Sequence, residues 1–574
     1  MAFSFLRATL PFIGLSGLIL SSMACYAYGQ SDIDSSQNAG GEIFSEKGGA
    51  GEEAGVVVEE QQEAPKFDIW EFRVKGNTLL DARDIELAVY RHLGPQKRLT
   101  DIEEAADALE RKYRDKGYPA VYVDIPEQDV VGGVVYLEAT EGKISRVRVT
   151  DSDYFALTEI KDGIPAATEG EVLHLPSFQQ DLNKLNTLSS DLSIVPILKQ
   201  GNTPGTMDID LKVKDKFPLH GEVSLNDYYS SNTSKTRVSA NIRYDNLWQK
   251  QHSFGFHVQS TPEDTDEIKV FSGTYVMPWK DTSNRMAFYA VKSESEIATL
   301  GGGNGLLVVG DSNIYGFRFI APLKSSPRYL HSLTLGVDYK DVEELVGFDD
   351  PDLQGITTPL SYTVWSAKYN ATTRSATATT RYGVGVNFGL TDFGNRIEEF
   401  EDKRFKGDPD FIYLLASMSQ QRYFEDDWQL KTAFRMQLTE SPLVSNEQFS
   451  AGGHSSVRGY HESQKVADIG FLAGLELKTP SLLNNKFEFI NEFRGLVFLE
   501  GAQLKIIDPL PDQDDRFTLS SVGIGMRMSA IDNLDLSLDW AYPLSNDCGD
   551  DCGADEGDIK KGDSRFTFDF SYKF

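Results

Sequence analysis

From about Pro218 to the C-terminus, apolar and polar residues alternate along segments of roughly ten residues, separated by turn-rich or acidic stretches. The clearest segment has Trp428, Leu430, Thr432, Phe434 and Met436 on one face and Gln429, Lys431, Ala433, Arg435 and Gln437 on the other. The chain ends with an aromatic row on one face of a last strand, made of Phe566, Phe568, Phe570, Tyr572 and Phe574. Such strands are typical of a transmembrane β-barrel, in which one face meets lipid and the other lines the lumen.

A soluble β-sandwich would alternate too, but exposed aromatic rows fit a lipid-facing wall and its interfacial girdle better. Residues 218–574 have room for about sixteen strands of about eleven residues with long outer loops, whereas eight strands would need very long loops throughout. We therefore expect a mainly β protein whose residues 218–574 form a transmembrane barrel of about sixteen strands.

Before this barrel the periodicity becomes mixed. Residues 67–74 alternate as a strand, and Ile85, Ala88 and Val89 then share one helical face. A second helix is expected to begin with a capping box between Thr100 and Glu103 and to end at Gly117. Strands over 120–125 and 133–139 complete a β-α-α-β-β unit, for which we expect the bounds 67–142.

A second unit of the same kind is expected over residues 143–217. It starts with a strand over 143–149, and a capping box between Ser177 and Gln180 is expected to open its helix. Its closing strand alternates apolar Met207, Ile209, Leu211 and Val213 with charged residues. The chain therefore contains two repeats of one small α/β fold.

The N-terminus has the layout of a secretory signal peptide, expected over residues 1–27. Arg7 precedes an apolar run from Ala8 to Leu20, and small residues follow up to Ala27. A lipoprotein signal using Cys25 is the alternative, but Ser22 stands where such signals usually carry Leu. Residues 28–66 are rich in Gly, Ser, Gln and Glu and predict a flexible acidic linker.

Charge and cysteines narrow the possible functions. The formal net charge of −31 and the lack of a basic stripe argue against nucleic-acid binding. Cys548 and Cys552 lie close together in an exported chain and predict a disulfide that closes a loop. We expect no metal site there, since further soft ligands are absent from this segment.

The sequence does not predict catalysis, and no cofactor is expected. Gly301 to Gly305 are glycine-rich but lack the Lys-Ser/Thr of a phosphate-binding loop. The histidines are scattered without the His-Glu-x-x-His spacing, and the acidic stretch 547–563 lacks the ligand order of a calcium loop. A Ser/His/Asp triad leaves no necessary local signature, but no nucleophile motif stands out.

Several short motifs resemble one family. They are Val74 to Asn77, Tyr113 to Pro119, Gly132 to Glu138 with Glu141 and Gly142, Leu182 to Asn186, Gly201 to Gly205, Asn226 with Asp227, and Asp245 to Leu247. With them, the chain resembles TpsB-type transporters of two-partner secretion, the ShlB/FhaC/HecB haemolysin secretion/activation family. That family belongs to the POTRA-plus-barrel superfamily of outer-membrane proteins. The resemblance identifies the two α/β units as POTRA domains.

The most specific motif consists of Val457, Arg458, Gly459 and Tyr460. In the superfamily it lies at the tip of a loop folded back into the barrel, here the inward loop, residues 440–466. The resemblance implies that Arg458 meets an acid in a Phe-x-Asp strand motif, which corresponds here to Phe498 and Glu500 with Glu in place of Asp. A solvated loop arginine is the alternative. An Arg–carboxylate contact inside a barrel is screened less than a surface pair and would fix the loop.

The resemblance implies that the protein lies in the outer membrane with its POTRA domains in the periplasm. It would bind an unfolded secreted partner, a TpsA-like exoprotein, and export it through the barrel. Outer-membrane lipid is a further expected partner, as is the barrel assembly machinery, through the last strand that ends at Phe574. A barrel assembly factor is an alternative, although such relatives usually have more POTRA repeats. A passive porin or receptor is another, but it would leave these repeats unexplained.

Overall fold

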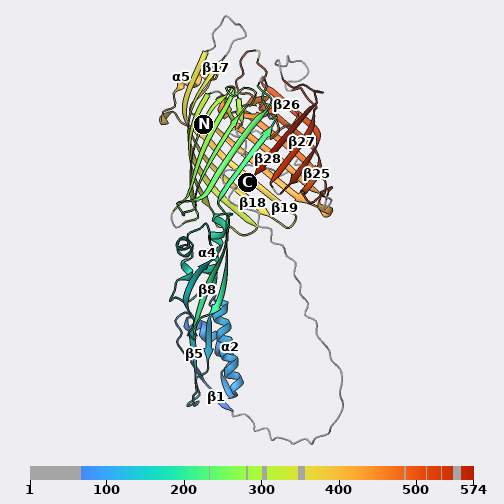
Figure 1. The fold of residues 1–574 in the computed structure, drawn as a ribbon. Coiled ribbons are helices and arrows are strands. Elements are labelled where there is room, and N and C mark those ends of the chain that lie inside the picture. The colour runs from blue at the N-terminus through green and yellow to red at the C-terminus, as the bar shows by residue number, and fades with distance from the viewer. Residues whose placement is uncertain are drawn as a thin grey trace, which may run out of the picture. The chain divides into compact units, whose positions relative to one another are not determined.

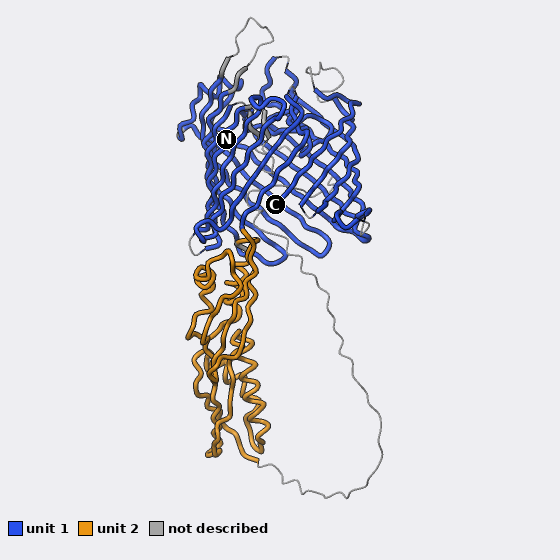
Figure 2. Tube along the Cα trace, in the orientation of Figure 1, with its two compact units in different colours: residues 1–26, 218–574 blue, residues 27–217 orange. Residues whose placement is uncertain are grey.

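The computed structural model describes residues 66–574 except 232, 280–281, 296, 300–306, 310, 347–355, 484–486, 512, 532 and 547–557. The described residues form two compact units, which lie within residues 27–217 and within residues 218–574 (Figure 2). The predicted signal peptide, almost all of the predicted linker, the glycine-rich segment from Gly301 to Gly305 and the Cys548–Cys552 pair lie outside the described residues. Among the described residues, no helix is both long enough and apolar enough to cross a membrane.

The first α/β part is a three-stranded sheet in the order β2-β5-β4, with β2 parallel and β4 antiparallel to the central β5. Its elements are β1 (Phe67–Ile69), β2 (Glu71–Lys75), α1 (Ala82–Val89), η1 (Tyr90–His92), β3 (Gly94–Lys97), α2 (Leu99–Asp115), β4 (Val121–Asp124) and β5 (Val134–Glu141). The helical periodicity buries Ile102, Leu109 and Tyr113 of α2 against Val135 and Leu137 of β5. The predicted β-α-α-β-β order is present, and the short β1–β3 pair is an addition to it.

The second α/β part repeats this arrangement with a sheet in the order β6-β8-β7. Its elements are β6 (Lys143–Thr150), α3 (Leu157–Asp162), η2 (Pro165–Ala167), α4 (Leu175–Leu188), β7 (Leu192–Gln200) and β8 (Thr206–Asp215). Phe178, Leu182 and Leu185 of α4 are buried in its core.

Both predicted capping boxes are wrong. The helix α2 begins at Leu99, one residue before Thr100, and the carboxylate of Asp101 accepts the backbone N–H of Arg98 at 2.9 Å. The helix α4 begins at Leu175, so Ser177 lies inside its first turn, where its hydroxyl contacts the His174 ring at 2.7 Å. A Ser or Thr followed by Glu or Gln fits the capping pattern at more than one register, and the packing of each helix selected another start.

The described strands of residues 218–574 close into the predicted barrel of sixteen strands (Figure 1). Every neighbouring pair is antiparallel, which leaves no free sheet edge in the membrane. The strands are β9 (Leu219–Asn226), β10 (Arg237–Leu247), β11 (His252–Ser260), β12 (Ile268–Pro278), β13 (Arg285–Ser295), β16 (Asp311–Pro322), β17 (Tyr329–Val346), β18 (Ile356–Arg374), β19 (Ala378–Gly389), β20 (Ile412–Tyr423), β21 (Gln429–Thr439), β24 (Ile469–Lys478), β25 (Ile490–Lys505), β26 (Arg516–Ala530), β27 (Leu534–Pro543) and β28 (Arg565–Lys573).

Between the barrel strands lie short elements. They are β14 (Ile297–Thr299), β15 (Leu307–Val309), η3 (Thr391–Phe393), α5 (Ile397–Lys403), η4 (Glu425–Asp427), η5 (Ser445–Glu447), β22 (Phe449–Ala451) and β23 (Lys465–Ala467). Of these, η5, β22 and β23 belong to the connection from β21 to β24, which contains the predicted inward loop.

The alternation predicted from the sequence sorts the barrel residues between two faces. On β25, Val497 and Leu499 are each 51% exposed, whereas Phe498 between them is 3% exposed. On the last strand, Phe566 is exposed while Arg565 and Thr567 are buried. The exposed face is therefore the apolar, lipid-facing one, and the protected face carries polar and charged side chains.

The barrel closes between its first and last strands through its shortest pairing. The β9–β28 register has five residue pairs, against eight in β10–β9 and β27–β28 and eighteen in β17–β18. Beyond the register, Gly221 and Phe574 exchange two backbone hydrogen bonds of 2.9 Å. A side chain at Gly221 would overlap the Phe574 ring. Fewer ladder pairs make this seam the weakest-paired junction among the described strands of the barrel.

Candidate functional site

The inward loop is packed against the inner face of the barrel wall. Its β22–β23 hairpin buries Phe449, Val457 and Tyr460 against inward-facing Leu472 of β24 and Leu504 of β25. Gly470 makes this approach possible, because a Cβ at that position would lie 2.0 Å from the Phe449 ring. The loop therefore lies inside the barrel.

Arg458 sits at the tip of the loop with its side chain 5% exposed. Its Nη2 donates to Glu500 Oε1 at 2.6 Å, and its Nε lies 3.0 and 3.2 Å from the two carboxylate oxygens. The backbone N–H of Arg458 also donates to Glu500 Oε2, at 2.9 Å. Arginine and carboxylate thus meet in a charge-assisted, multiply bonded contact.

Two further carboxylates of the described chain face the same guanidinium. Arg458 Nη1 lies 2.9 Å from Glu476 Oε2 on β24 and 3.5 Å from Asp539 Oδ2 on β27. We call Arg458, Glu476, Glu500 and Asp539 the Arg458 cluster. Arg527 on β26 binds Asp539 through both terminal nitrogens at 2.8 and 2.9 Å, which supplies a second positive charge. Lys478, 3.5 Å from Glu476 Oε1, supplies a third positive charge, so three cations face three carboxylates in a site that water hardly reaches.

The sequence identified Arg458 and Glu500 as a pair and missed Glu476 and Asp539. Both occupy inward positions of strands in which inward and outward residues alternate. Leu475 and Leu538 beside them point outward with about 40% exposure. An acidic residue on the polar face of a barrel strand was therefore a usable signal. Which inward acids share one arginine depends on strand register, which the alternation does not give.

Phe498 forms the floor beneath the guanidinium. The Arg458 Cζ atom lies 3.5 Å from the centre of the Phe498 ring. This geometry adds a cation–π contact to the ion pairs. The Phe-x-acid spacing thus places two different contacts for Arg458 on the inner face of one strand.

The remaining residues of the motif fix the tip against neighbouring strands. Gly459 has φ +99°, and a Cβ there would lie 3.1 Å from Ala541 Cβ on β27, so this position favours glycine on two grounds. The Tyr460 hydroxyl donates to the Ser545 carbonyl at 2.7 Å. Val457 is completely buried. The structure therefore brings all four motif residues into the contact region around Phe498 and Glu500.

The tip of the loop also contacts both sides of the β9–β28 seam. Arg565 of β28 donates to the Tyr460 carbonyl and, across the seam, to the Asp227 carbonyl, each at 3.0 Å. Directly after β9, the Tyr228 ring stacks on His454 of the loop with 4.3 Å between centroids. The same segment accepts the Glu462 N–H at the Tyr229 carbonyl, at 3.1 Å. Sequence reasoning missed these contacts.

Comparison with known families decides the identity of this architecture. The model of the haemolysin secretion/activation protein family ShlB/FhaC/HecB matches residues 205–500, and that of the ShlB-type POTRA domain matches residues 67–142. The chain belongs to this family. It is therefore an outer-membrane transporter of two-partner secretion, which moves a partner exoprotein through its barrel. The predicted family, fold class, function and location are confirmed.

Individual relatives of the transporter are distant. The outer membrane transporter CdiB of Escherichia coli O6:K15:H31 (strain 536) is 24% identical over 463 residues, 79% of this chain and 75% of the relative. CdiB of Dickeya dadantii (strain 3937) is 26% identical over 198 residues, 34% of either chain, so that match spans about a third of its relative. The solved CdiB from Escherichia coli superposes with a TM-score of 0.61 at 18% identity, covering 90% of this chain and 92% of its own. This last likeness concerns the fold.

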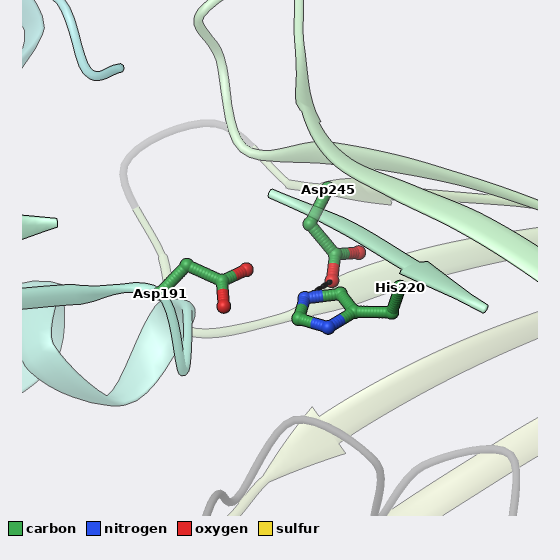
Figure 3. Close-up of side chains that lie close together, drawn as sticks. All are labelled: Asp191, His220 and Asp245. Carbon is green, nitrogen blue, oxygen red and sulfur yellow. Dashed lines mark ion pairs between the residues drawn. The ribbon is translucent and has the colours of Figure 1, made fainter. Parts of the chain in front are cut away.

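A histidine and an aspartate also face each other on the transporter's first two barrel strands. His220 Nε2 lies 3.7 Å from Asp245 Oδ2 (Figure 3). Asp245 also pairs with Arg243 at 2.9 Å, so this contact belongs to the charge network of the wall. Asp191, also drawn in Figure 3, is part of the other compact unit, where its carbonyl accepts the Lys216 N–H at 2.9 Å.

Proposed function

We propose that the transporter captures its unfolded partner with two periplasmic POTRA domains and that the Arg458 cluster holds the inward loop in its working position. In this assignment residues 1–27 are a signal peptide, 28–66 a linker, 67–142 and 143–217 the POTRA domains, and 218–574 the barrel. The observation that carries the proposal is the burial of Arg458 among Glu476, Glu500 and Asp539 inside a closed barrel.

We call the contact of Arg458 with its three carboxylates the lock of the inward loop. The position of the loop explains why this lock matters for transport. The tip contacts β24, β25 and β27 through Arg458 and β28 through Arg565. A chain passing through the lumen has to pass this tip. The lock therefore defines one position from which the tip is displaced and to which it returns. Without it, the tip samples many positions in the lumen and obstructs the passage.

Sheet edges of the POTRA domains support capture of an extended segment by β-augmentation, in which the segment adds as a further strand. On β4 the Val123 N–H is already bonded to Glu110 Oε1 at 3.0 Å. On β7 the side chain of Asn186 bonds both the N–H and the carbonyl of Ile194, and Pro196 follows without an N–H. These two edges are therefore partly closed to an incoming strand.

The outer edge of β2 differs from them. Its residues Phe72 to Lys75 receive no side-chain cap on their backbone among the contacts of the described residues, and Trp70 beside them is 59% exposed. We infer that the partner segment adds to β2. A photo-crosslinking residue at Arg73 should trap the partner during secretion, whereas one at Ser193 on β7 should not. Trapping only at Ser193 would contradict this choice of edge.

The chain's function is proposed to be transport without catalysis, so movement would be driven by folding of the partner outside the cell. Contact of the aromatic outer face with lipid, and recognition of the Phe574 strand by the barrel assembly machinery, are part of the proposal. The predicted Cys548–Cys552 disulfide remains a proposal as well.

Removal of residues 67–213 tests the transport role. Secretion should stop while the barrel still assembles in the outer membrane. Depletion of the whole protein separates the alternatives, because loss of one secreted protein is expected for export, broad loss of barrels for assembly and loss of solute flux for a porin. Normal secretion by the truncated chain would refute the role of the POTRA domains.

A further inference from the structure

A buried carboxylate, Glu447, attaches the base of the inward loop to the barrel wall. Its side chain is 2% exposed. The Tyr362 hydroxyl on β18 donates to Oε1 at 2.7 Å, and the Tyr413 hydroxyl on β20 donates to Oε2 at 2.6 Å. The ammonium group of Lys340 on β17 forms an ion pair with Oε1. Donors from three strands therefore fix both oxygens of one carboxylate.

The chain around Glu447 is packed equally closely. Leu443 and Val444 are buried with Phe400 and Phe411 in one apolar cluster. Asp468, directly after the loop, is fully buried and accepts the Leu443 N–H at 2.8 Å. The base is thus held by apolar packing, by backbone hydrogen bonds and by the ion pairs of Glu447 with Lys340 and of Asp468 with Arg404.

This attachment is separate from the Arg458 cluster. Glu447 binds strands β17, β18 and β20, whereas Arg458 binds β24, β25 and β27. Between the two points the chain passes through Gly452 with φ +110° and Gly453 with φ +98°. Two successive glycines in the left-handed region give the link a backbone that can adopt other conformations at low cost.

We propose that Glu447 is a positioning residue for secretion, which keeps the base of the loop on the wall while only the tip, residues 452–464, is displaced. This inference rests on the proposed function of the Arg458 cluster and adds a fixed point to it. The loop then swings about Gly452 and Gly453 and stays inside the barrel throughout the cycle.

The physical reason is that breaking each of the two attachments costs its own free energy. Moving the tip breaks the ion pairs of Arg458 and the tip's hydrogen bonds to neighbouring strands, but leaves the ion pair of Glu447 in place. Withdrawing the whole loop would also leave Glu447 and Lys340 as uncompensated buried charges, which is the costly way to break a buried pair. Displacement of the tip with a fixed base is therefore the less costly movement.

Hydrogen exchange of the full-length protein in detergent micelles tests this division. In Arg458→Ala, amides of residues 452–464 should lose protection at least about tenfold, while those of residues 443–449 should keep it. Equal loss in both segments would overturn the fixed base. If neither segment changes, the Arg458 lock of the proposed function fails, and the Glu447 variants below decide separately whether that residue holds the base.

Glu447→Gln keeps the shape and removes the charge. Residues 443–449 should then lose protection and secretion should fall at least about tenfold, because Lys340 is left unpaired. Lys340→Met together with Glu447→Gln should recover much of both, since no charge is then stranded. Asn446→Ala is the matched control, because the buried Nδ2 of Asn446 has no partner in the described chain. Full protection in Glu447→Gln, or no recovery in the double variant, would overturn the proposal.

Discussion

The most informative perturbation of the transporter is Arg458→Ala compared with Glu500→Ala. A two-residue lock, as the sequence alone suggests, predicts equal effects of the two changes. The structure changes this expectation, because Arg458 contacts three carboxylates while Glu500 is one of them. Arg458→Ala should therefore be the more severe change. The double variant should be scarcely worse than Arg458→Ala, since both act through the same contact.

The magnitudes follow from burial. Removing one partner of a buried ion pair costs about 3–5 kcal/mol, so Arg458→Ala should raise the population of the undocked tip about 150- to 4,500-fold. Glu500→Ala removes the main acceptor but leaves Glu476 and Asp539 within 3.5 Å of the guanidinium. Its cost should resemble the loss of hydrogen bonds to a charged group, roughly 1.5–3 kcal/mol, or about 10- to 150-fold.

Two assays read this out. In planar lipid bilayers the undocked tip should change the conductance and the frequency of open events. The change from wild type should be larger in Arg458→Ala than in Glu500→Ala. Secretion of the partner into the medium should fall in the same order. Glu500→Asp should retain much of the activity, because it keeps the charge, although its side chain is shorter by one methylene.

Arg318→Ala serves as a matched control, because Arg318 forms a bidentate pair with Asp338 within the wall, at 2.6 and 2.7 Å, and in the part of the chain that the structure describes it contacts no residue of the inward loop. It should lower the stability of the barrel without changing the conductance. Wild-type conductance and secretion in Arg458→Ala would refute the lock. An Arg318→Ala phenotype equal to that of Arg458→Ala would show that wall stability, and not loop position, is being measured.

Three further predictions concern other parts of the molecule. Amides of β9 and β28 should exchange at least about tenfold faster than those of β17 and β18, because five pairs hold the seam; equal rates would contradict this. Hydrogen bonds from Arg148 and Lys199 lower the pKa of Asp210 to about 2 from 3.8, so they stabilise the second α/β part above pH of about 4. The difference between wild type and Asp210→Asn in the free energy of unfolding, measured with urea, should disappear as the pH falls from about 6 toward 2. A difference that does not depend on pH would refute the stabilising role of the Asp210 carboxylate. Gly459→Ala should weaken tip docking by about 1–3 kcal/mol, measured as a change of conductance in the same direction as in Arg458→Ala, whereas Gly273→Ala, with open space around its Cβ, should match wild type; identical traces for both would argue against strain at Gly459.

Alternation along the chain was sufficient to predict the barrel, because a strand between lipid and lumen needs opposite chemistry on its two faces. Leu430 and Phe434 on one side and Lys431 and Arg435 on the other show this requirement within a single strand. The exact ends of helices were less predictable. At Thr100 and Ser177 the local capping pattern was present, but burial of the α2 and α4 faces chose other first residues.

The residues of the candidate site also fall into those that the sequence predicted and those that only the structure shows. A motif and the parity of one strand sufficed to select Arg458, Phe498 and Glu500 from the sequence. Glu476 and Asp539 were chosen by tertiary structure, since their approach to Arg458 depends on how far each strand is shifted against its neighbour. Glu447 was also beyond reach of the sequence, because its donors come from three strands and a loop can meet a wall at many places. Local periodicity thus fixed which side chains face the lumen, and barrel closure with its register decided which of them meet.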